Sequence, residues 1–308
     1  MDWLPIILTI LGLCAFEVIS SIDNAVVNAD VLATMGAKAR RWFLVWGIFF
    51  GVFLVRGLLP WGIVWMANPS LGLIGSFTAA FSNDPHIIDS VAKSAPLLLM
   101  AGGVFLVFLF FHWLFLEDKE FGIKGERFFS HHGVWFFALA SILLSALIWF
   151  SLKLDPLMAF SATIGSSAFF IIYGFREQAE KAEKELSHNR GLSDLSKLMY
   201  LEVLDATFSI DGVVGAFAFT MSVPLIIIGN GIGALVVRQF TIKGVDSIKK
   251  FKFLKNGAMY SILFLGVIMI SESFGIEVPK YVSPLVTFGV IGVFLFKSIR
   301  HNRIEPTN

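Results

Sequence analysis

The sequence has only one cysteine and few charged residues. The single cysteine, Cys14, excludes a disulfide within the chain, and no CxxC pair is present to bind a metal or support redox chemistry. Only 15% of the residues are charged, against about 25% in typical soluble domains. Hydrophobic residues make up 56% of the chain, and the mean hydropathy is +0.77. We therefore expect a polytopic membrane protein with little room for a soluble domain.

Several other signals are missing. The N-terminus, Met1-Asp2-Trp3, has no basic region, and no small-residue cleavage site follows a short apolar run, so we expect no cleavable signal peptide. A net charge of +1 gives no sign of a nucleic-acid partner. Because no catalytic constellation of a soluble enzyme is visible, we expect neither an enzyme nor a permanently bound cofactor.

Long apolar segments recur along the chain, and a membrane-spanning helix needs about 20 such residues. They predict an all-α fold with nine spans, near residues 3–34, 42–66, 97–116, 133–152, 156–175, 198–221, 224–242, 256–275 and 283–299. The first span is too long for one straight crossing. The expected domains are a first membrane half at 1–175 (helices 1–5), a charged cytoplasmic linker at 176–197, a second half at 198–300 (helices 6–9) and a cytoplasmic tail at 301–308.

Basic residues divide unevenly between the two sides of this topology. Of the 24 Lys and Arg residues, nineteen fall in alternate connections and the C-terminus, and three fall on the opposite side. Since Lys and Arg favour the cytoplasmic side, we expect a plasma (inner) membrane protein with its N-terminus outside and its C-terminus in the cytoplasm. Two connections, 67–95 and 176–197, read as solvated connectors, the first with or without a short re-entrant piece and the second beginning as a continuation of span five.

Carboxylates and other polar groups interrupt the first and sixth predicted spans. An ionisable side chain at bilayer depth costs at least about 2.5–3.5 kcal/mol, so such residues are rare without a function. When Asp23 is aligned with Asp211, Ser-Ile-Asp coincides in the two segments and Glu17 falls on Asp205. The predicted ion ligands are Glu17, Asp23, Asn24, Asp205 and Asp211, with Ser21, Asn28, Glu202 and Ser209 as additional candidates.

The two acidic segments enter the membrane from opposite sides, as in inverted-repeat transporters with a site near the midplane. A second similarity, between residues 51–56 and 233–238, follows each acidic segment, so helices 1–3 and 6–8 are the predicted repeat. At about 100° per residue, Glu17 and Asp23 do not converge on one regular helix. They converge only if the helix unwinds near Ser20–Asn24, or if two crossing helices each contribute a different face.

Other polar residues leave two interpretations open. Arg56 and Arg238 lie inside predicted spans, either as counter-charges to the acids or as side chains that extend to the interface. Glu272 is either a group on the exit pathway or an exposed helix end. The pair Gly102-Gly103 and the glycines at 229, 231 and 233 indicate close helix contacts.

The segment Phe16–Ala25 resembles the first-helix signature of the TerC family, within the LysE-type exporter superfamily, and Ser209-Ile210-Asp211-Gly212 resembles its second-half counterpart. This resemblance implies efflux of manganese or a related divalent cation, a link to tellurium resistance, and cation ligation by Glu17, Asp23, Asn24, Asp205 and Asp211. The second half departs from the pattern, with Gly212 in place of the amide at Asn24.

The expected function is export of a divalent cation, Mn²⁺ above others, in exchange for protons. Carboxylate, amide and hydroxyl oxygens are hard ligands that suit Mg, Ca or Mn. Clustered carboxylates hold extra protons when the site is empty, and a dication would displace them. The metal ion and membrane lipid are the expected partners. The alternatives are a membrane scaffold in a metal or tellurium stress-response complex, and a carrier of an anionic solute that binds to Arg56 and Arg238.

Overall fold

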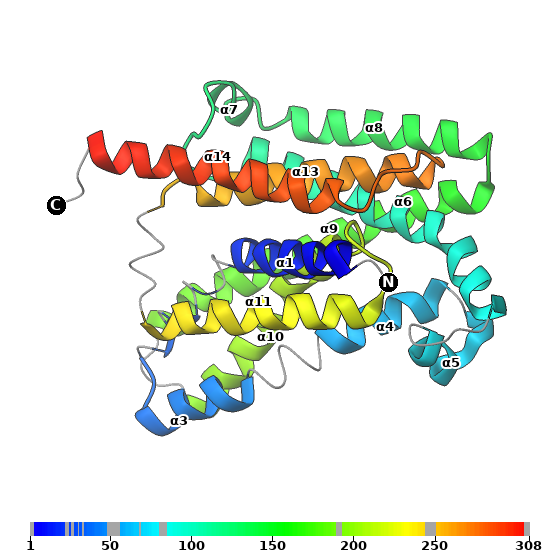
Figure 1. Cartoon of the computed structure of the whole chain (residues 1–308). Helices are drawn as coiled ribbons and strands as arrows, with labels where there is room; N and C mark the ends of the chain where they lie inside the picture. The colour runs from blue at the N-terminus through cyan, green and yellow to red at the C-terminus, as the bar shows by residue number, and fades with distance from the viewer. Residues whose placement is uncertain are drawn as a thin grey trace.

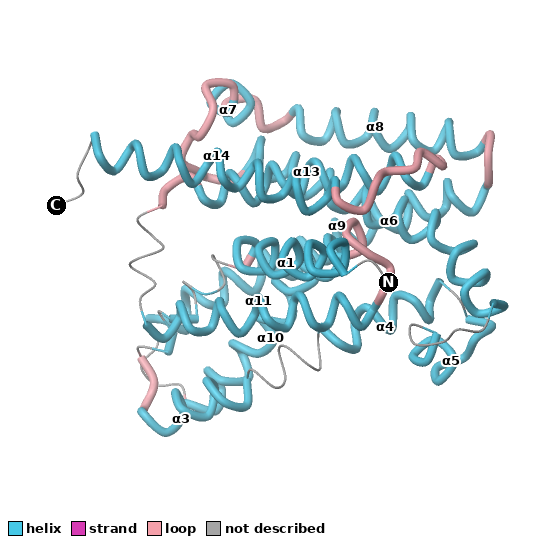
Figure 2. The backbone as a smooth tube through the Cα atoms, viewed as in Figure 1, coloured by secondary structure: helices cyan, strands magenta, loops and turns pink. Residues whose placement is uncertain are grey.

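The computed structural model describes residues 3–304 except 22–24, 26–27, 30, 33, 48–55, 68, 80–84, 189–192 and 244–250. Every regular element in this part of the chain is a helix, and most of the long helices run roughly parallel to one another (Figures 1 and 2). The first half contains α1 (Trp3–Ser20), α3 (Ala37–Trp42), a π-helical turn (Phe43–Gly47), α4 (Arg56–Ala67), a 3₁₀ turn (Pro69–Leu71), α5 (Gly72–Ala79), α6 (Pro85–Leu116), α7 (Glu126–Ser130), α8 (Trp135–Leu152) and α9 (Pro156–His188). The second half contains α10 (Asp194–Ala216), α11 (Val223–Lys243), α13 (Leu254–Ser273) and α14 (Val282–Ile304).

Six of these helices are long and apolar enough to cross a membrane, and α11 contributes a shorter apolar segment, Val223–Gln239. The all-α prediction is therefore confirmed, with six to seven spans in the described residues instead of nine. The predicted sixth span is helical, as α10, but its acids make it less apolar than a spanning helix. The predicted second span, 42–66, is divided between the end of α3, the π-helical turn and α4, and its residues 48–55 lie outside the description.

The connections also differ from the prediction. Within 67–95, the chain forms α5, and α6 already begins at Pro85, twelve residues before the predicted span. Proline at this first position has no N–H to leave unsatisfied. The predicted continuation of span five is confirmed, because α9 remains helical as far as His188.

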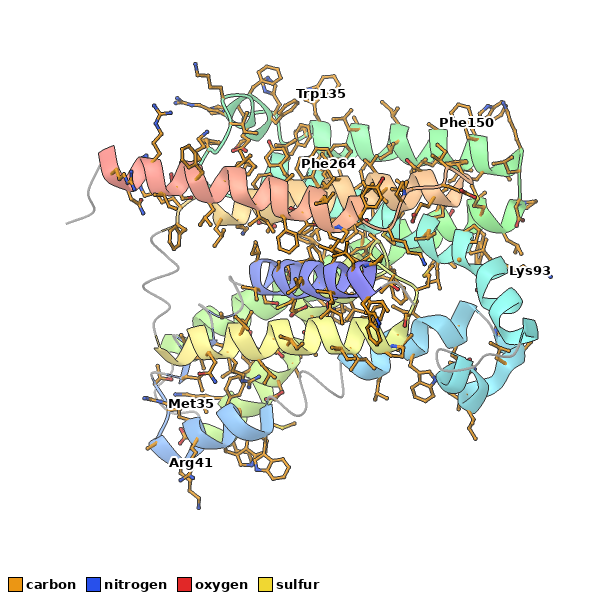
Figure 3. The ribbon with its side chains drawn as sticks, viewed as in Figure 1. Met35, Arg41, Lys93, Trp135, Phe150 and Phe264 are labelled. Carbon is orange, nitrogen blue, oxygen red and sulfur yellow. The ribbon has the colours of Figure 1, made fainter. Side chains whose placement is uncertain are left out.

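Two groups of helices make up the bundle. The first is centred on α1, which lies between α14 and α11 and also contacts α10 and α13 (Figure 1). The second is centred on α6, which packs against α13, α9 and α8 and carries much of the aromatic core, including Phe108 and Trp113. Large apolar side chains of the outer helices point away from the bundle, among them Trp135, Phe150 and Phe264 (Figure 3), as expected for a surface facing lipid tails.

Close helix contacts are made where glycine replaces a side chain. A Cβ atom at Gly103 of α6 would lie 2.9 Å from the carbonyl oxygen of Gly266 of α13, and a Cβ at Gly266 would lie 3.1 Å from the carbonyl oxygen of Gly103. A Cβ at Gly165 of α9 would collide with the backbone carbonyl of Ala101. Lipid tails are as apolar as leucine, so packing at short distance has to replace the hydrophobic effect between these helices. The predicted role of Gly102-Gly103 is thus confirmed.

A matched pair of substitutions in α9 tests this packing. Gly165→Ala is expected to lower stability by about 1–3 kcal/mol, because a backbone carbonyl cannot move aside as a flexible side chain can. Gly174→Ala on the same helix meets nothing within 4 Å and should be neutral or stabilising by about 0.5–1 kcal/mol. Thermal unfolding in detergent gives both values, and equal melting temperatures for the two variants would contradict the assigned contact.

Candidate functional site

The carboxylate of Glu17 lies at the meeting point of three helices. Glu17 is fully buried, at 0% exposure, and its Oε1 accepts a hydrogen bond of 2.8 Å from the Ser21 hydroxyl. A Cβ atom at Gly212 of α10 would lie 2.7 Å from Glu17 Oε2, and one at Gly233 of α11 would lie 2.6 Å from Glu17 Cβ. The carboxylate therefore occupies space that two missing side chains leave on α10 and α11.

An amide from α11 completes this environment. Asn230 is also fully buried, and its Nδ2 donates to the carbonyl oxygen of Gly212 at 3.4 Å. Its Oδ1 is buried and accepts no hydrogen bond from the described residues. The sequence analysis missed Asn230, although an amide between Gly229 and Gly231 in an apolar span was a signal of the same kind as Asn24 and Asn28. Hereafter the Glu17 site means Glu17, Ser21, Gly212, Asn230 and Gly233.

The second acidic segment is divided between two sides of α10. Gly212 faces Glu17, whereas the carboxylate of the preceding residue, Asp211, accepts a hydrogen bond of 3.3 Å from Arg176 of α9. Asp23 and Asn24, the central residues of the first motif, lie outside the described residues, so the predicted approach of Asp23 to Asp211 stays a prediction. The amides of Ser21 and Ala25 both donate to the carbonyl four residues earlier, at 3.1 and 3.0 Å, which is helical hydrogen bonding without unwinding at these two positions.

Glu202, Asp205 and Ser209 lie along α10 toward its N-terminus. Asp205 and Ser209 are buried, and the Ser209 hydroxyl donates to the Asp205 carbonyl oxygen. The buried guanidinium of Arg238 donates to the carbonyl of Phe43 at 2.8 Å and lies 4.2 Å from the centre of its ring. The Arg238 guanidinium and the Glu202 carboxylate both lie against Gly47. A Cβ atom added at Gly47 would collide with both groups, so the two groups are close to each other.

Of the two predicted counter-charges, Arg238 is therefore placed beside an acid of the second half, and it does not extend to an interface. The side chain of Arg56 lies outside the described residues. Asn28, another predicted candidate, is buried, with 6% exposure.

The described residues contain no group of three or more His, Cys, Asp or Glu side chains positioned to hold a metal ion. The predicted five-ligand site is thus not assembled by the described residues alone, which lack Asp23 and Asn24.

A second cluster, which the sequence analysis missed, lies at the end of the bundle where α6 stops. Glu117 accepts from Lys255 at 3.0 Å and lies 3.6 Å from His112 Nδ1. With Arg176 and Asp211 these residues form what we call the charged cluster. The expectation that Arg176 begins a solvated connector is wrong, because its side chain is largely buried against Asp211. The basic residues of this cluster could have been matched to acids only with knowledge of which helices are neighbours.

The electrostatics of Glu117 follow from these contacts. Burial by itself would raise the pKa of Glu117, but the nearby His112 ring and the positive charges of Lys255 and Arg176 outweigh burial and hold this pKa well below its ordinary value of 4.5. A group with a lowered pKa in the folded state stabilises the fold above its unfolded pKa. That stabilisation is lost as the pH falls from the unfolded toward the folded value.

The pH dependence of stability should therefore change when Glu117 is replaced. The melting temperature of the wild type is expected to fall as the pH drops below about 4.5, because the unfolded chain then binds a proton at Glu117 that the folded protein does not bind. Glu117→Gln should start lower at pH 7 and show a shallower fall over the same range. The control is Glu277→Gln, which removes an exposed carboxylate. A Glu117→Gln profile parallel to that of the wild type would rule out this role for Glu117.

Comparisons with known proteins place the chain among membrane proteins. It is 27% identical to an uncharacterized membrane protein of Myxococcus xanthus over 114 residues, which is 37% of this chain and 35% of the relative. It is 29% identical to an uncharacterized membrane protein of Rickettsia prowazekii over 105 residues, 32% of this chain and 35% of the relative. The chain thus matches about a third of the length of these relatives. No solved structure matches it.

A family model covers most of the chain and corrects the family predicted from the acidic motifs. The model is that of DUF475, "Protein of unknown function", and it matches residues 22–305. The TerC resemblance depended on two short motifs and is wrong, because this match extends over nearly the whole sequence and leads to another family. This integral membrane protein therefore belongs to the DUF475 family.

Proposed function

We propose that this protein transports a divalent cation across the membrane, with Mn²⁺ as the preferred ion, export as the direction and protons as the counter-ion. The observation that carries the proposal is the fully buried carboxylate of Glu17, which lies between α1, α10 and α11. A carboxylate at this depth is costly and is generally found on ion or substrate pathways. Its surroundings also offer oxygen atoms as further ligands.

The donor set around Glu17 fits a hard cation. The carboxylate, the Ser21 hydroxyl and the amide oxygen of Asn230 are all oxygen ligands, and the Asn230 oxygen accepts no hydrogen bond from the described residues. Such ligands suit Mg²⁺, Ca²⁺ or Mn²⁺ and do not suit soft-metal chemistry. We infer that Asp23 and Asn24, on the continuation of the same segment, add to this set when the ion binds. Protons are the proposed counter-ion because a dication and protons would compete for the same carboxylate oxygens.

Two reciprocal contacts support an inverted repeat of helices 1–3 and 6–8. Gly103 and Gly266 exchange equivalent contacts between α6 and α13, which would be the third helices of the two halves. Glu17 of α1 packs on Gly233 of α11, and Glu202 of α10 packs on Gly47 in the predicted second span. Each acidic helix thus contacts a glycine in the second helix of the other half. With α10 and residues 42–66 counted as crossings, this repeat gives nine spans and a site near the midplane.

Neither alternative function is favoured by the described residues. An anion carrier would need a guanidinium available to its solute, but Arg238 is buried against the carbonyl and ring of Phe43 and beside Glu202. A scaffold would have no need of a carboxylate deep between three helices. Transport of a cation accounts for both observations, since Arg238 then balances an acid of the bundle.

Transport by the purified protein in liposomes tests the proposal. We expect the wild type to move Mn²⁺, detected by a trapped fluorescent indicator, faster than protein-free liposomes, and an opposing pH gradient to accelerate it. Glu17→Gln keeps the size of the side chain but removes its charge and should reduce the rate by at least about tenfold, a transition-state effect of about 1.4 kcal/mol. Ca²⁺ and Mg²⁺ in parallel assays establish the preference.

The matched control is again Glu277→Gln, an identical change at an exposed position, which should transport at the wild-type rate. Monodisperse elution and an unchanged melting temperature establish that Glu17→Gln is folded. A folded Glu17→Gln variant with the wild-type rate would refute the role of Glu17. Wild-type liposomes no faster than empty ones for all three dications would refute the cation as the substrate.

A further inference from the structure

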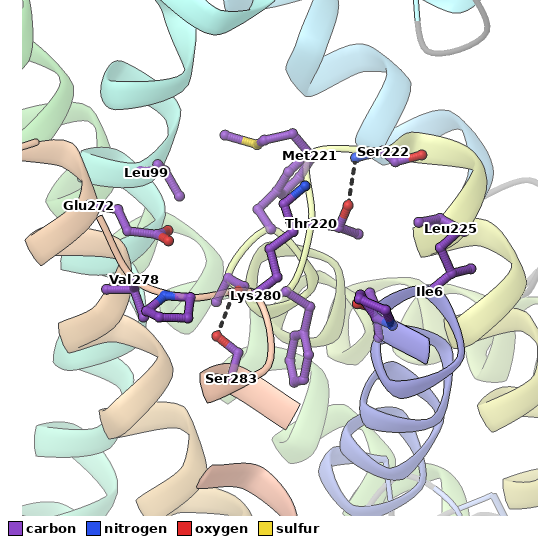
Figure 4. A pocket seen from close by; sticks show the side chains of 16 residues that line it. Ile6, Leu99, Thr220, Met221, Ser222, Leu225, Glu272, Val278, Lys280 and Ser283 are labelled. Atoms are coloured by element: carbon purple, nitrogen blue, oxygen red, sulfur yellow. Dashed lines mark hydrogen bonds between the residues drawn. The ribbon is translucent and has the colours of Figure 1, made fainter. Parts of the chain in front are cut away.

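The two ends of the bundle differ in how far they open. At the end where α1 begins, a cavity of about 730 Å³ lies between α1, α6, α13 and the turn from α10 to α11 (Figure 4). Pro5, Ile6 and Thr9 of α1 line one wall, and Glu272 and Lys280 are its charged residues. At the opposite end, the charged cluster surrounds a cavity of only about 30 Å³, lined by Ser20, Glu117, Arg176, Asp211 and Lys255, among others.

Both cavities lie along α1, with Glu17 between them. Thr9 lines the large cavity, Ser20 lines the small one, and Glu17 lies two turns, or about 12 Å, beyond Thr9. Leu13 and Phe16 are packed at 0% and 1% exposure between Thr9 and Glu17, and Phe219 lies against Gly12. The large cavity therefore leads toward the Glu17 site from one end and stops at an apolar layer.

Two ion pairs at the small cavity join four helices. Arg176 connects α9 to Asp211 of α10, and Lys255 at the start of α13 connects to Glu117 at the end of α6. All four side chains line the same small cavity as Ser20, so each cation neutralises an acid that faces this cavity. The α6–α13 contact is already held by Gly103 and Gly266, so the Glu117–Lys255 pair is not needed to bring those helices together.

We propose that Arg176 and Lys255 close the transport path at the charged end, and that the large cavity is the open mouth of the path at the other end. The inference rests on the proposed function for the identity of the ion, but it concerns which residues block the route. Closure is electrostatic as well as steric, because acids that are paired with Arg176 and Lys255 no longer attract a cation. Opening requires both pairs to separate, which moves α9 from α10 and α13 from the end of α6.

Cysteine labelling can test this closure without any transported ion. The only native cysteine is removed by Cys14→Ala, and a single reporter is introduced, either Ser20→Cys in the small cavity or Ser222→Cys in the large one. A membrane-impermeant maleimide is added to right-side-out and inside-out vesicles. In the otherwise unchanged protein, Ser222→Cys should react from one side, and Ser20→Cys should be protected from both.

The charge-removing pair Arg176→Gln and Lys255→Gln should raise labelling of Ser20→Cys by about tenfold or more, only from the side opposite to the one that labels Ser222→Cys. The control pair, Lys124→Gln and Arg127→Gln, removes two exposed charges from the segment that follows α6 and should leave Ser20→Cys protected. A charge exchange, Glu117→Lys with Lys255→Glu, should retain protection because it restores an ion pair. Unchanged melting temperatures exclude unfolding as the cause of labelling.

Two results would overturn the proposal. The first is a Ser20→Cys reporter that remains protected after both cations are removed, and the second is one that is already labelled in the unchanged protein. The readout separates this inference from the proposed function. If labelling of Ser20→Cys increases as expected but wild-type liposomes transport no dication, closure by Arg176 and Lys255 is supported and the proposed ion is wrong. If dications are transported but labelling does not respond, the ion stands and the closure is wrong.

Discussion

The contact between α1, α10 and α11 depends on how the carboxylate of Glu17 is packed, because a lipid environment gives these helices no hydrophobic reason to associate. Between membrane helices there is no hydrophobic driving force, so the α1–α10–α11 contact requires close packing, and small residues provide it. Gly212 and Gly233 leave the space that Glu17 fills, so the same two glycines bring the helices together and admit the charge. Ser21 supplies one hydrogen bond to this carboxylate, and Asn230 binds the backbone of Gly212. At this site, the same residues therefore determine both the packing of the helices and the burial of the charge.

Helix α10 contacts both the Glu17 site and the charged cluster. Gly212 faces Glu17, and Asp211, one residue earlier, faces Arg176 of α9. Because adjacent residues on a helix point about 100° apart, a rotation of α10 large enough to release Asp211 from Arg176 would also change the space beside Glu17. Binding at the Glu17 site and separation of the ion pairs would then bias the same movement. Such a shared two-state element is what coupling between two sites requires.

The sequence could predict those features that local composition determines. The spans at 133–152 and 256–275 correspond within about two residues to α8 and α13, and the glycines at 102–103, 229 and 233 do lie at close helix contacts. It could not assign Arg176 and Lys255, because a basic residue at the end of an apolar segment has the same local pattern whether it faces water or a buried acid on another helix. The described residues contain six to seven apolar spans, and α10 is not among them because its acids lower its hydropathy below that of an ordinary crossing.

The mistaken family has a physical explanation that bears on function. A carboxylate followed after one helical turn by a hydroxyl and an amide is what any membrane helix needs to offer oxygen ligands to a cation, since these side chains then share one face. Families of different descent can share such a short pattern, so Glu17, Ser21 and Asn24 do not by themselves identify a family. The family follows from the match over residues 22–305, and the proposed ion follows from the oxygen atoms around Glu17. Replacing the first conclusion therefore leaves the argument for the second intact.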